Sequence, residues 1–124
     1  MPKIMVVDDE LLLRSMLKDA LEEVGYTVVL AEDGRTAIAR AKAESPDCIL
    51  LDIMMPGLDG YETCAALKAD PDLAAIPVLL VSATTDLRVV DRAEQVGATT
   101  VLAKPVPIEQ LEQALILALN PPQP

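Results

Sequence analysis

Short apolar runs alternate along the chain with longer segments in which apolar residues recur at helical spacing. Four runs are almost wholly apolar, at residues 3–7, 47–51, 77–81 and 100–103. Strands of a parallel sheet have this composition, because helices bury both of their faces. We therefore predict that these four runs are strands buried on both faces, and that 26–31 forms a fifth strand.

Helix signals fill the intervals between these strands. Apolar residues recur at helical spacing over 12–24, and Gly25 is a candidate left-handed C-cap. Asp33 is a candidate N-cap, and Asp59 with Glu62 resembles a capping box. The predicted helices cover residues 12–24, 34–44, 60–69, 86–96 and 107–119.

Strand and helix thus alternate five times over 124 residues, a length typical of one domain. Such alternation with short connections requires right-handed crossovers and a parallel sheet with helices on both faces. The sequence therefore predicts a doubly wound α/β fold, (βα)5, over residues 1–120, with a Pro-rich tail at 121–124.

The charge balance narrows the choice of partners. Twenty acidic and ten basic residues give a net charge of −10, so nucleic acid and anionic membranes are repelled. No apolar run approaches the ~20 residues of a membrane-spanning helix, and the first residues lack the features of a signal peptide. We therefore expect a cytoplasmic protein that binds neither nucleic acid nor a membrane directly.

The core is predicted to be aliphatic, because apolar residues make up 52% of the chain while Tyr26 and Tyr61 are its only aromatic residues. Cys48 lies in a predicted strand and Cys64 in a predicted helix. They lack CxxC spacing, and the chain has no His to complete a metal site. Both are therefore expected to be reduced core thiols.

Polar residues stand where the apolar strands end: Asp8 and Asp9, then Asp52, Ser82 and Lys104. Because ligands of open α/β sheets bind outside the carboxyl ends of the strands, we expect these side chains to converge. Two carboxylates 4 Å apart repel each other by about 4 kcal/mol at an effective dielectric of 20, so three of them require a cation. Mg²⁺ prefers oxygen ligands and leaves room for phosphate oxygens. The set therefore predicts a divalent metal and a phosphoryl group.

Taken singly, each of these five residues could have a structural role instead: the aspartates as helix caps, the hydroxyl in a turn and the lysine as a surface cation. An EF-hand over residues 52–60 is excluded, because Met54 and Pro56 stand where that loop needs side-chain oxygens. The chain also lacks a Gly-rich phosphate loop, so a flavin or nucleotide fold of the same topology loses its main support.

Four motifs resemble those of the response-regulator receiver domain. They are VVDDE at 6–10, LDIMMPGLDG at 51–60, VSA at 81–83 and KP at 104–105. The resemblance covers residues 3–119, and the motifs occur in order at the ends of the predicted strands, which makes the combined signal specific. It implies a flavodoxin-like fold with strand order 2-1-3-4-5 and a cis peptide bond before Pro105.

The resemblance also implies how a metal is held. Asp9 and Asp52 would bind one Mg²⁺ or Mn²⁺ ion directly, and Asp8 would bind it through water. The backbone carbonyl of Met54 would complete the ligands that the protein supplies.

By the same resemblance, Asp52 is the phosphoacceptor of a two-component phosphorelay. Its carboxylate would attack phosphorus and form an aspartyl phosphate, while Lys104 and Ser82 contact the phosphoryl group. The donor would be a histidine kinase or a histidine phosphotransfer protein, and phosphorylation would control binding of a downstream partner. Apart from this self-phosphotransfer and slow autodephosphorylation, no enzyme activity is expected.

The chain departs from the family at Val101, where receiver domains usually carry Tyr or Phe. A β-branched side chain cannot make the inward turn of an aromatic ring that accompanies phosphorylation in the family. We therefore expect the output change to be small or to travel through residues 84–88, beginning at Thr84.

Two predicted helices carry more apolar side chains than one buried face needs. By resemblance, Leu11 and Ser15 of the first helix and Pro105 meet the phosphodonor. The fourth and fifth predicted helices would meet the output partner or a second copy of the chain, with Ile116 and Leu119 on the fifth. Simple packing against the sheet is the alternative for each of these residues.

Three other functions stay open. The chain could be a receiver module of a larger regulator or hybrid kinase rather than a single-domain protein. It could be an Mg-dependent phosphohydrolase that works through an aspartyl phosphate, although it has no His to act as acid or base. It could also be a scaffold that is never phosphorylated, which the complete set of site residues disfavours.

Overall fold

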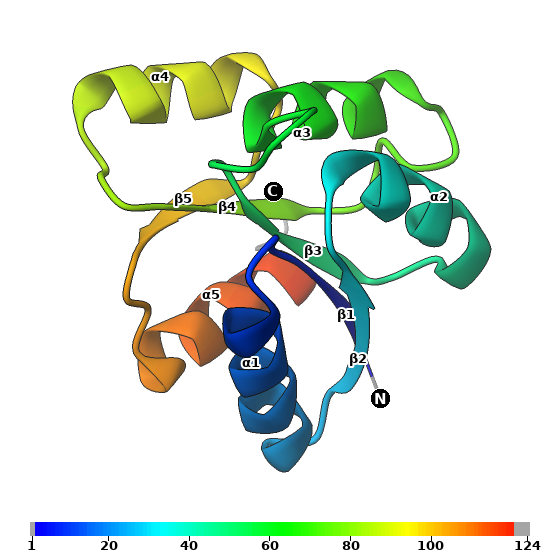
Figure 1. Cartoon of the computed structure of the whole chain (residues 1–124), viewed down its shortest axis with the longest axis vertical. Helices are drawn as coiled ribbons and strands as arrows, with labels where there is room; N and C mark the ends of the chain where they lie inside the picture. Colours follow the sequence, from blue (N-terminus) through cyan, green and yellow to red (C-terminus); the bar gives the residue numbers. More distant parts are fainter. Residues whose placement is uncertain (1, 121–124) are drawn as a thin grey trace.

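Five strands alternate with five helices in the computed structural model, which describes residues 2–120 (Figure 1). The strands are β1 (Lys3–Val7), β2 (Thr27–Ala31), β3 (Cys48–Asp52), β4 (Val78–Ser82) and β5 (Thr100–Ala103). The helices are α1 (Leu11–Glu23), α2 (Gly34–Glu44), α3 (Gly60–Ala69), α4 (Leu87–Gln95) and α5 (Ile108–Leu119). The predicted Pro-rich tail at 121–124 lies outside the described residues.

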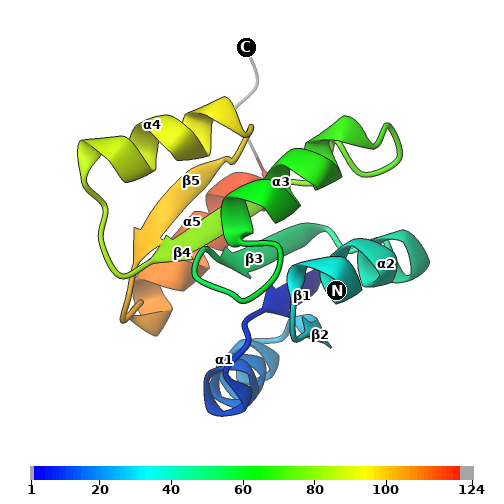
Figure 2. The ribbon, with the colours of Figure 1, turned by 45° about the horizontal axis from the view of Figure 1, so that its top comes forward.

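All neighbouring strands pair in parallel, in the order β2-β1-β3-β4-β5. Helices α2, α3 and α4 cover one face of the sheet, and α1 and α5 cover the other (Figure 2). The chain therefore has the predicted doubly wound α/β fold with the predicted strand order. Because β1 lies between β2 and β3, the winding direction changes between β1 and β3, which is where ligands bind in such sheets.

Burial along the strands follows their place in the sheet. Every residue of β3 and β4 is buried, as predicted for strands covered on both faces. The same prediction is wrong for β5, in which Thr100 and Ala103 are exposed. The reason is that β5 is an edge strand with a single neighbour, so the helices overlap it only in part.

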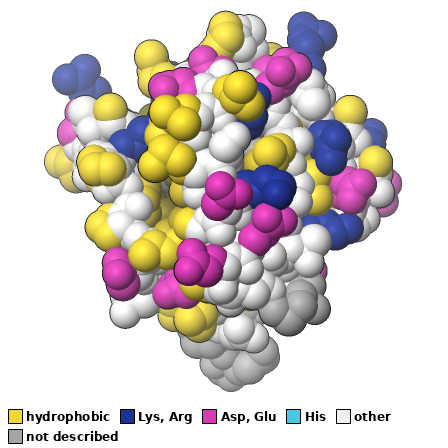
Figure 3. All heavy atoms as spheres, turned by 60° about the horizontal axis from the view of Figure 1, so that its bottom comes forward, with side chains coloured by type: hydrophobic (Ala, Val, Ile, Leu, Met, Phe, Trp, Pro, Cys, Tyr) yellow, Lys and Arg dark blue, Asp and Glu magenta, His cyan; other side chains and the backbone are white. Residues whose placement is uncertain are grey.

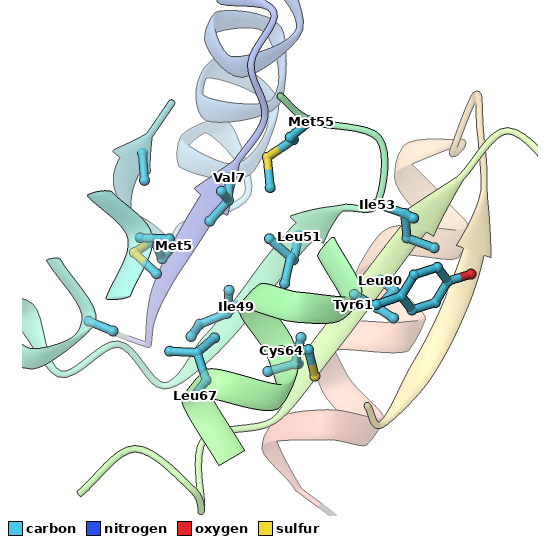
Figure 4. Close-up of a cluster of buried hydrophobic side chains, with 14 of the residues drawn as sticks. Met5, Val7, Ile49, Leu51, Ile53, Met55, Tyr61, Cys64, Leu67 and Leu80 are labelled. Atoms are coloured by element: carbon cyan, nitrogen blue, oxygen red, sulfur yellow. The ribbon is translucent and has the colours of Figure 1, made fainter. Parts of the chain in front are cut away.

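The core has two halves, one on each face of the sheet, and both are mainly aliphatic. On the face covered by α2, α3 and α4, residues of β1 and β3 face Cys64 and Leu67 of α3 (Figure 4). On the other face, Leu21, Leu111 and Leu115 of α1 and α5 pack against the sheet. Both cysteines are buried and free.

Asp33 and the pair Asp59 and Glu62 act at the helix ends as the sequence predicted. The carboxylate of Asp33 accepts a hydrogen bond from a backbone N–H group of α2, and Asp59 forms a full capping box with Glu62. Asp86, predicted as the first residue of a helix, is instead the N-cap of α4 and accepts a hydrogen bond from a backbone N–H group of that helix. Gly25 has φ 106°, a left-handed conformation that glycine adopts without strain. The peptide bond before Pro105 is cis, as the resemblance implied.

We expect Leu115→Ala to lower the free energy of unfolding by about 2–5 kcal/mol, because it removes a fully buried side chain from the core. Urea denaturation measures the change. The matched control is Leu117→Ala on the same helix, whose side chain is 65% exposed and whose loss should change stability by no more than about 0.5 kcal/mol. Equal losses in the two variants would contradict the orientation of α5.

Candidate functional site

The five polar residues of the strand ends come together at the carboxyl edge of the sheet. Asp8 and Asp9 directly follow β1, Asp52 and Ser82 are the last residues of β3 and β4, and Lys104 directly follows β5. Asp8, Asp52 and Ser82 are buried, whereas Asp9 is exposed. The parallel sheet thus produces the convergence that the sequence predicted.

Carboxylate oxygens of Asp8, Asp9 and Asp52 all lie within 4.8 Å of one another. The donor set contains oxygen alone, which matches a hard cation such as Mg²⁺ rather than zinc or copper. Asp9 is exposed, whereas Asp8 and Asp52 are buried. The group is therefore open to solvent at Asp9, and a phosphoryl group can approach from there. The geometry therefore fits the divalent ion that the charge argument requires.

Lys104 supplies a positive charge at the same place. Its Nζ lies 3.2 Å from Oδ1 of Asp52 and 3.7 Å from Oδ2 of Asp8. Burial alone lowers the pKa of the Lys104 ammonium, but the hydrogen bond and charge of Asp52, then the charge of Asp8, outweigh it and raise the pKa. Lys104 is therefore charged at neutral pH.

Asp52 is a buried carboxylate whose pKa is raised. Burial raises the pKa most, and the nearby charge of Asp8 acts in the same direction, whereas the hydrogen bond from Lys104 lowers it. Burial and the charge of Asp8 together therefore outweigh the ammonium of Lys104, and a bound cation would favour the ionised form of Asp52.

Backbone hydrogen bonds fix the loops that carry these groups. Oδ1 of Asp8 accepts a hydrogen bond of 2.9 Å from the N–H of Glu10, and Nη1 of Arg14 donates one of 2.7 Å to the carbonyl of Asp8. The hydroxyl oxygen of Ser82 accepts from the N–H of Thr84 at 3.2 Å. Arg14 was missed in the sequence, because nothing in the pattern of α1 indicates that its side chain reaches back to β1.

Gly60 allows the loop after β3 to fold back onto the strand that carries Asp52. Its N–H donates to the carbonyl of Ile53 at 2.8 Å, and an added Cβ would lie 2.6 Å from the carbonyl oxygen of Asp52. Any side chain at this position must therefore move the backbone of the Asp52 strand end. One signal in the sequence could have indicated this constraint: a glycine directly follows the helix cap Asp59.

The residues predicted to transmit the signal lie around this site. Val101 is half-buried against the core half under α2, α3 and α4, and Thr84 is exposed. The side chain of Met54 is 75% exposed in the loop after β3, two residues after Asp52.

The residues predicted for partner surfaces differ in exposure. Leu11, Ile116 and Pro105 are exposed, and Ser15 is half-buried. Leu119 is half-buried and packs against the core half under α1 and α5, the alternative that the sequence also allowed. An apolar pattern around the whole helix gives no orientation, so the exposed Leu117 could not be told from the half-buried Leu119.

A family model described as the response regulator receiver domain matches residues 4–116. The chain belongs to this family. It is thus a receiver domain of the two-component response regulators, whose members interact with histidine kinases and downstream partners. Within the described residues, none of the helices is both long and apolar enough to cross a membrane.

Relatives and solved structures agree with this assignment. The receiver domain is 37% identical over 113 residues to protein PilG of Pseudomonas aeruginosa, covering 91% of this chain and 84% of PilG. It is 39% identical over 120 residues to the probable transcriptional regulator ycf27 of Guillardia theta, covering 95% of this chain and 45% of that regulator. The chemotaxis protein CheY4 of Vibrio cholerae superposes with a TM-score of 0.92 at 34% identity, covering 96% of this chain and 99% of that one. The chain thus spans about half the length of ycf27 and most of the length of PilG and of CheY4.

We expect Gly60→Ala to lower the free energy of unfolding by about 1–3 kcal/mol through overpacking, and also to weaken Mg²⁺ binding because the Asp52 strand end must shift. Urea denaturation and metal titration measure the two effects. The control is Gly57→Ala in the same loop, where the added Cβ meets open space and only the φ of 75° is unfavourable, at about 1 kcal/mol. Undiminished metal affinity in Gly60→Ala would show that the loop does not position Asp52.

Proposed function

We propose that this receiver domain accepts a phosphoryl group on Asp52 from a phosphohistidine donor and signals through phosphorylation-dependent binding of a protein partner. The observation that supports it most directly is the arrangement around Asp52. Two further carboxylates offer oxygens within 4.8 Å, and an ammonium lies 3.2 Å from Oδ1 of Asp52. Family membership supports the same reaction class.

Asp9 and Asp52 would hold an Mg²⁺ or Mn²⁺ ion directly, with Asp8 acting through water and the carbonyl of Met54 as a further ligand. When bound, the ion supplies positive charge for the equatorial oxygens of the phosphoryl group and offsets the repulsion among the carboxylates. Magnesium is favoured because the donor set consists of oxygen atoms.

The side chains of the domain carry the rest of the reaction. A carboxylate oxygen of Asp52 attacks phosphorus, and the bond from phosphorus to the donor nitrogen breaks. Lys104 moves its ion pair from Asp52 to a phosphoryl oxygen, and the Ser82 hydroxyl donates to another. Buried strands on both sides keep Asp52 in place, so the protein contributes mainly positioning and fixed charge.

The partner surfaces in this proposal follow the exposed apolar side chains. Leu11 at the start of α1, together with Ser15 and Pro105, faces a histidine kinase or phosphotransfer protein. Ile116 of α5 faces the output partner or a second copy of the chain. Because these donors act in the cytoplasm, we place this domain there. The domain spans residues 1–120 and stands either alone or within a longer regulator.

Val101 shapes the response to phosphorylation. Because it has no ring to turn inward and little freedom at χ1, we propose that the change passes through the loop at Thr84 and the following helix α4. The hydrogen bond from Thr84 to Ser82 supports this route, since drawing the Ser82 hydroxyl toward a phosphoryl group changes that contact.

Incubation with acetyl phosphate and Mg²⁺ tests the phosphoacceptor. We expect intact-mass spectrometry to show a single phosphoryl adduct on the wild type and none on Asp52→Asn, because the amide is not a nucleophile. Asp47→Asn is the matched control, since Asp47 precedes the same strand at its other end. An adduct that survives in Asp52→Asn would contradict the assignment, as would labelling that does not depend on Mg²⁺.

Lys104→Met is expected to separate metal binding from phosphoryl transfer. Removing an ammonium beside two metal-binding carboxylates should strengthen Mg²⁺ binding roughly 2–10-fold, while labelling by acetyl phosphate slows at least ~10-fold. Calorimetric titration and timed mass spectra measure the two effects. The control is Lys42→Met, which breaks the ion pair with Asp70 far from the site. Weaker Mg²⁺ binding in Lys104→Met would contradict the charge argument.

A further inference from the structure

An apolar groove runs between α1 and α5 and opens at the phosphoacceptor. Its volume is about 520 Å³, within the range of pockets that hold small molecules. Leu50 and Val81 of the neighbouring strands β3 and β4 form its floor, and Leu17 of α1 and Leu111 of α5 stand on its two sides. Figure 3 shows the side of the molecule that carries these helices, where hydrophobic side chains gather with acidic side chains near them.

The groove lies between the two helices and is lined by aliphatic side chains without an aromatic ring. The chain has neither Phe nor Trp, Tyr61 belongs to the core half on the opposite face of the sheet, and Tyr26 packs on this face without lining the groove. Leucine, isoleucine and methionine side chains stand beside smaller ones, among them Ala20 on α1, Ala83 after β4 and Val106 before α5. An aliphatic chain of a ligand could occupy the space that an aromatic residue would otherwise fill.

One end of the groove is polar and the rest is not. Asp8, Asp52 and Lys104 line the same cavity as the apolar residues, so the groove begins at the reacting carboxylate. It then follows α1 from Leu13 to Ala20, about 10 Å along the helix at 1.5 Å per residue. A ligand with one charged end and one unbranched apolar chain matches this division.

We propose that the groove binds the chain of a medium-chain acyl phosphate, and that such an acyl phosphate is a small-molecule phosphodonor of this domain. The proposal rests on the phosphoacceptor role of Asp52 described above. In the reaction, a carboxylate oxygen of Asp52 bonds to phosphorus while the bond from phosphorus to the acyl oxygen breaks. The electron pair of that bond stays on the departing fatty carboxylate, so neither an oxidant nor an added proton is needed.

The charges of the site agree with this donor. Lys104 and a bound cation would offset the charge of the phosphoryl oxygens, while the acyl chain needs a surface without charge, which the floor and sides of the groove provide. Each methylene group that leaves water strengthens binding roughly fourfold. Even partial burial of an octanoyl chain should therefore favour octanoyl phosphate over acetyl phosphate by at least ~10-fold at low donor concentration.

The test compares labelling rates with the two donors in the presence of Mg²⁺, followed by intact-mass spectrometry. The measured quantity is the ratio of the octanoyl to the acetyl rate, so a general effect of a variant on phosphorylation cancels. We expect a ratio of at least ~10 for the wild type and a ratio near 1 for Ala20→Phe, which fills the groove. Ala39→Phe, at an exposed position of α2 on the other face, is the matched control and should keep the wild-type ratio.

A binding measurement makes the test independent of the reaction and of the folding of the variant. Octylphosphonate should bind the wild type at least ~10-fold more tightly than methylphosphonate and should shift the methyl resonances of Leu13, Leu17 and Leu111 in NMR spectra. Equal affinities, shifts elsewhere, or a ratio of rates that Ala20→Phe leaves unchanged would overturn the groove proposal alone. Failure of both donors to label Asp52 would overturn the phosphoacceptor role as well.

Discussion

Mutual repulsion among Asp8, Asp9 and Asp52 is the constraint on which the structure of this site depends. Their oxygens lie within 4.8 Å of one another, and Lys104 offsets one of the three negative charges. Two of the carboxylates are also buried, which adds a desolvation cost to the repulsion. A structure can hold such a group only if the surrounding backbone is rigid and if a cation can complete it, and the receiver domain meets both conditions.

The rigidity comes from the centre of the sheet. β3 and β4 are buried along their full length, and β1 along all but its first residue, so Asp52 and Ser82 extend from strands that have neighbours on every side. The close approach of Gly60 fixes the loop after Asp52 from the other direction. The positions of the site residues therefore depend on the packing of the aliphatic core, because a shift of one strand end would move a carboxylate.

Much of this arrangement could be predicted from the sequence, because a strand end is marked where an apolar run meets a polar residue. The edge position of β5 could not be predicted from its own residues, since it depends on how the other crossovers are arranged. The role of Arg14 was equally hidden, because a long side chain can reach several acceptors. In α5 the apolar pattern surrounds the helix, and so the partial burial of Leu119 and the exposure of Leu117 depend on packing that the pattern does not encode.

The attachment of α4 to the rest of the domain bears on how the domain can respond to a change of charge. Only Ala93 of α4 is buried, and the Arg92 guanidinium stacks 4.4 Å from the ring centre of Tyr61 on α3. An exposed cation–π contact of this kind contributes about 0.5–1 kcal/mol. α4 is therefore held by few buried contacts, and segments of this kind open locally at low free-energy cost. Because α4 begins shortly after Ser82 and Thr84, a new charge at Asp52 would act close to a lightly held helix, whereas Val101 lies on a strand that pairs with β4.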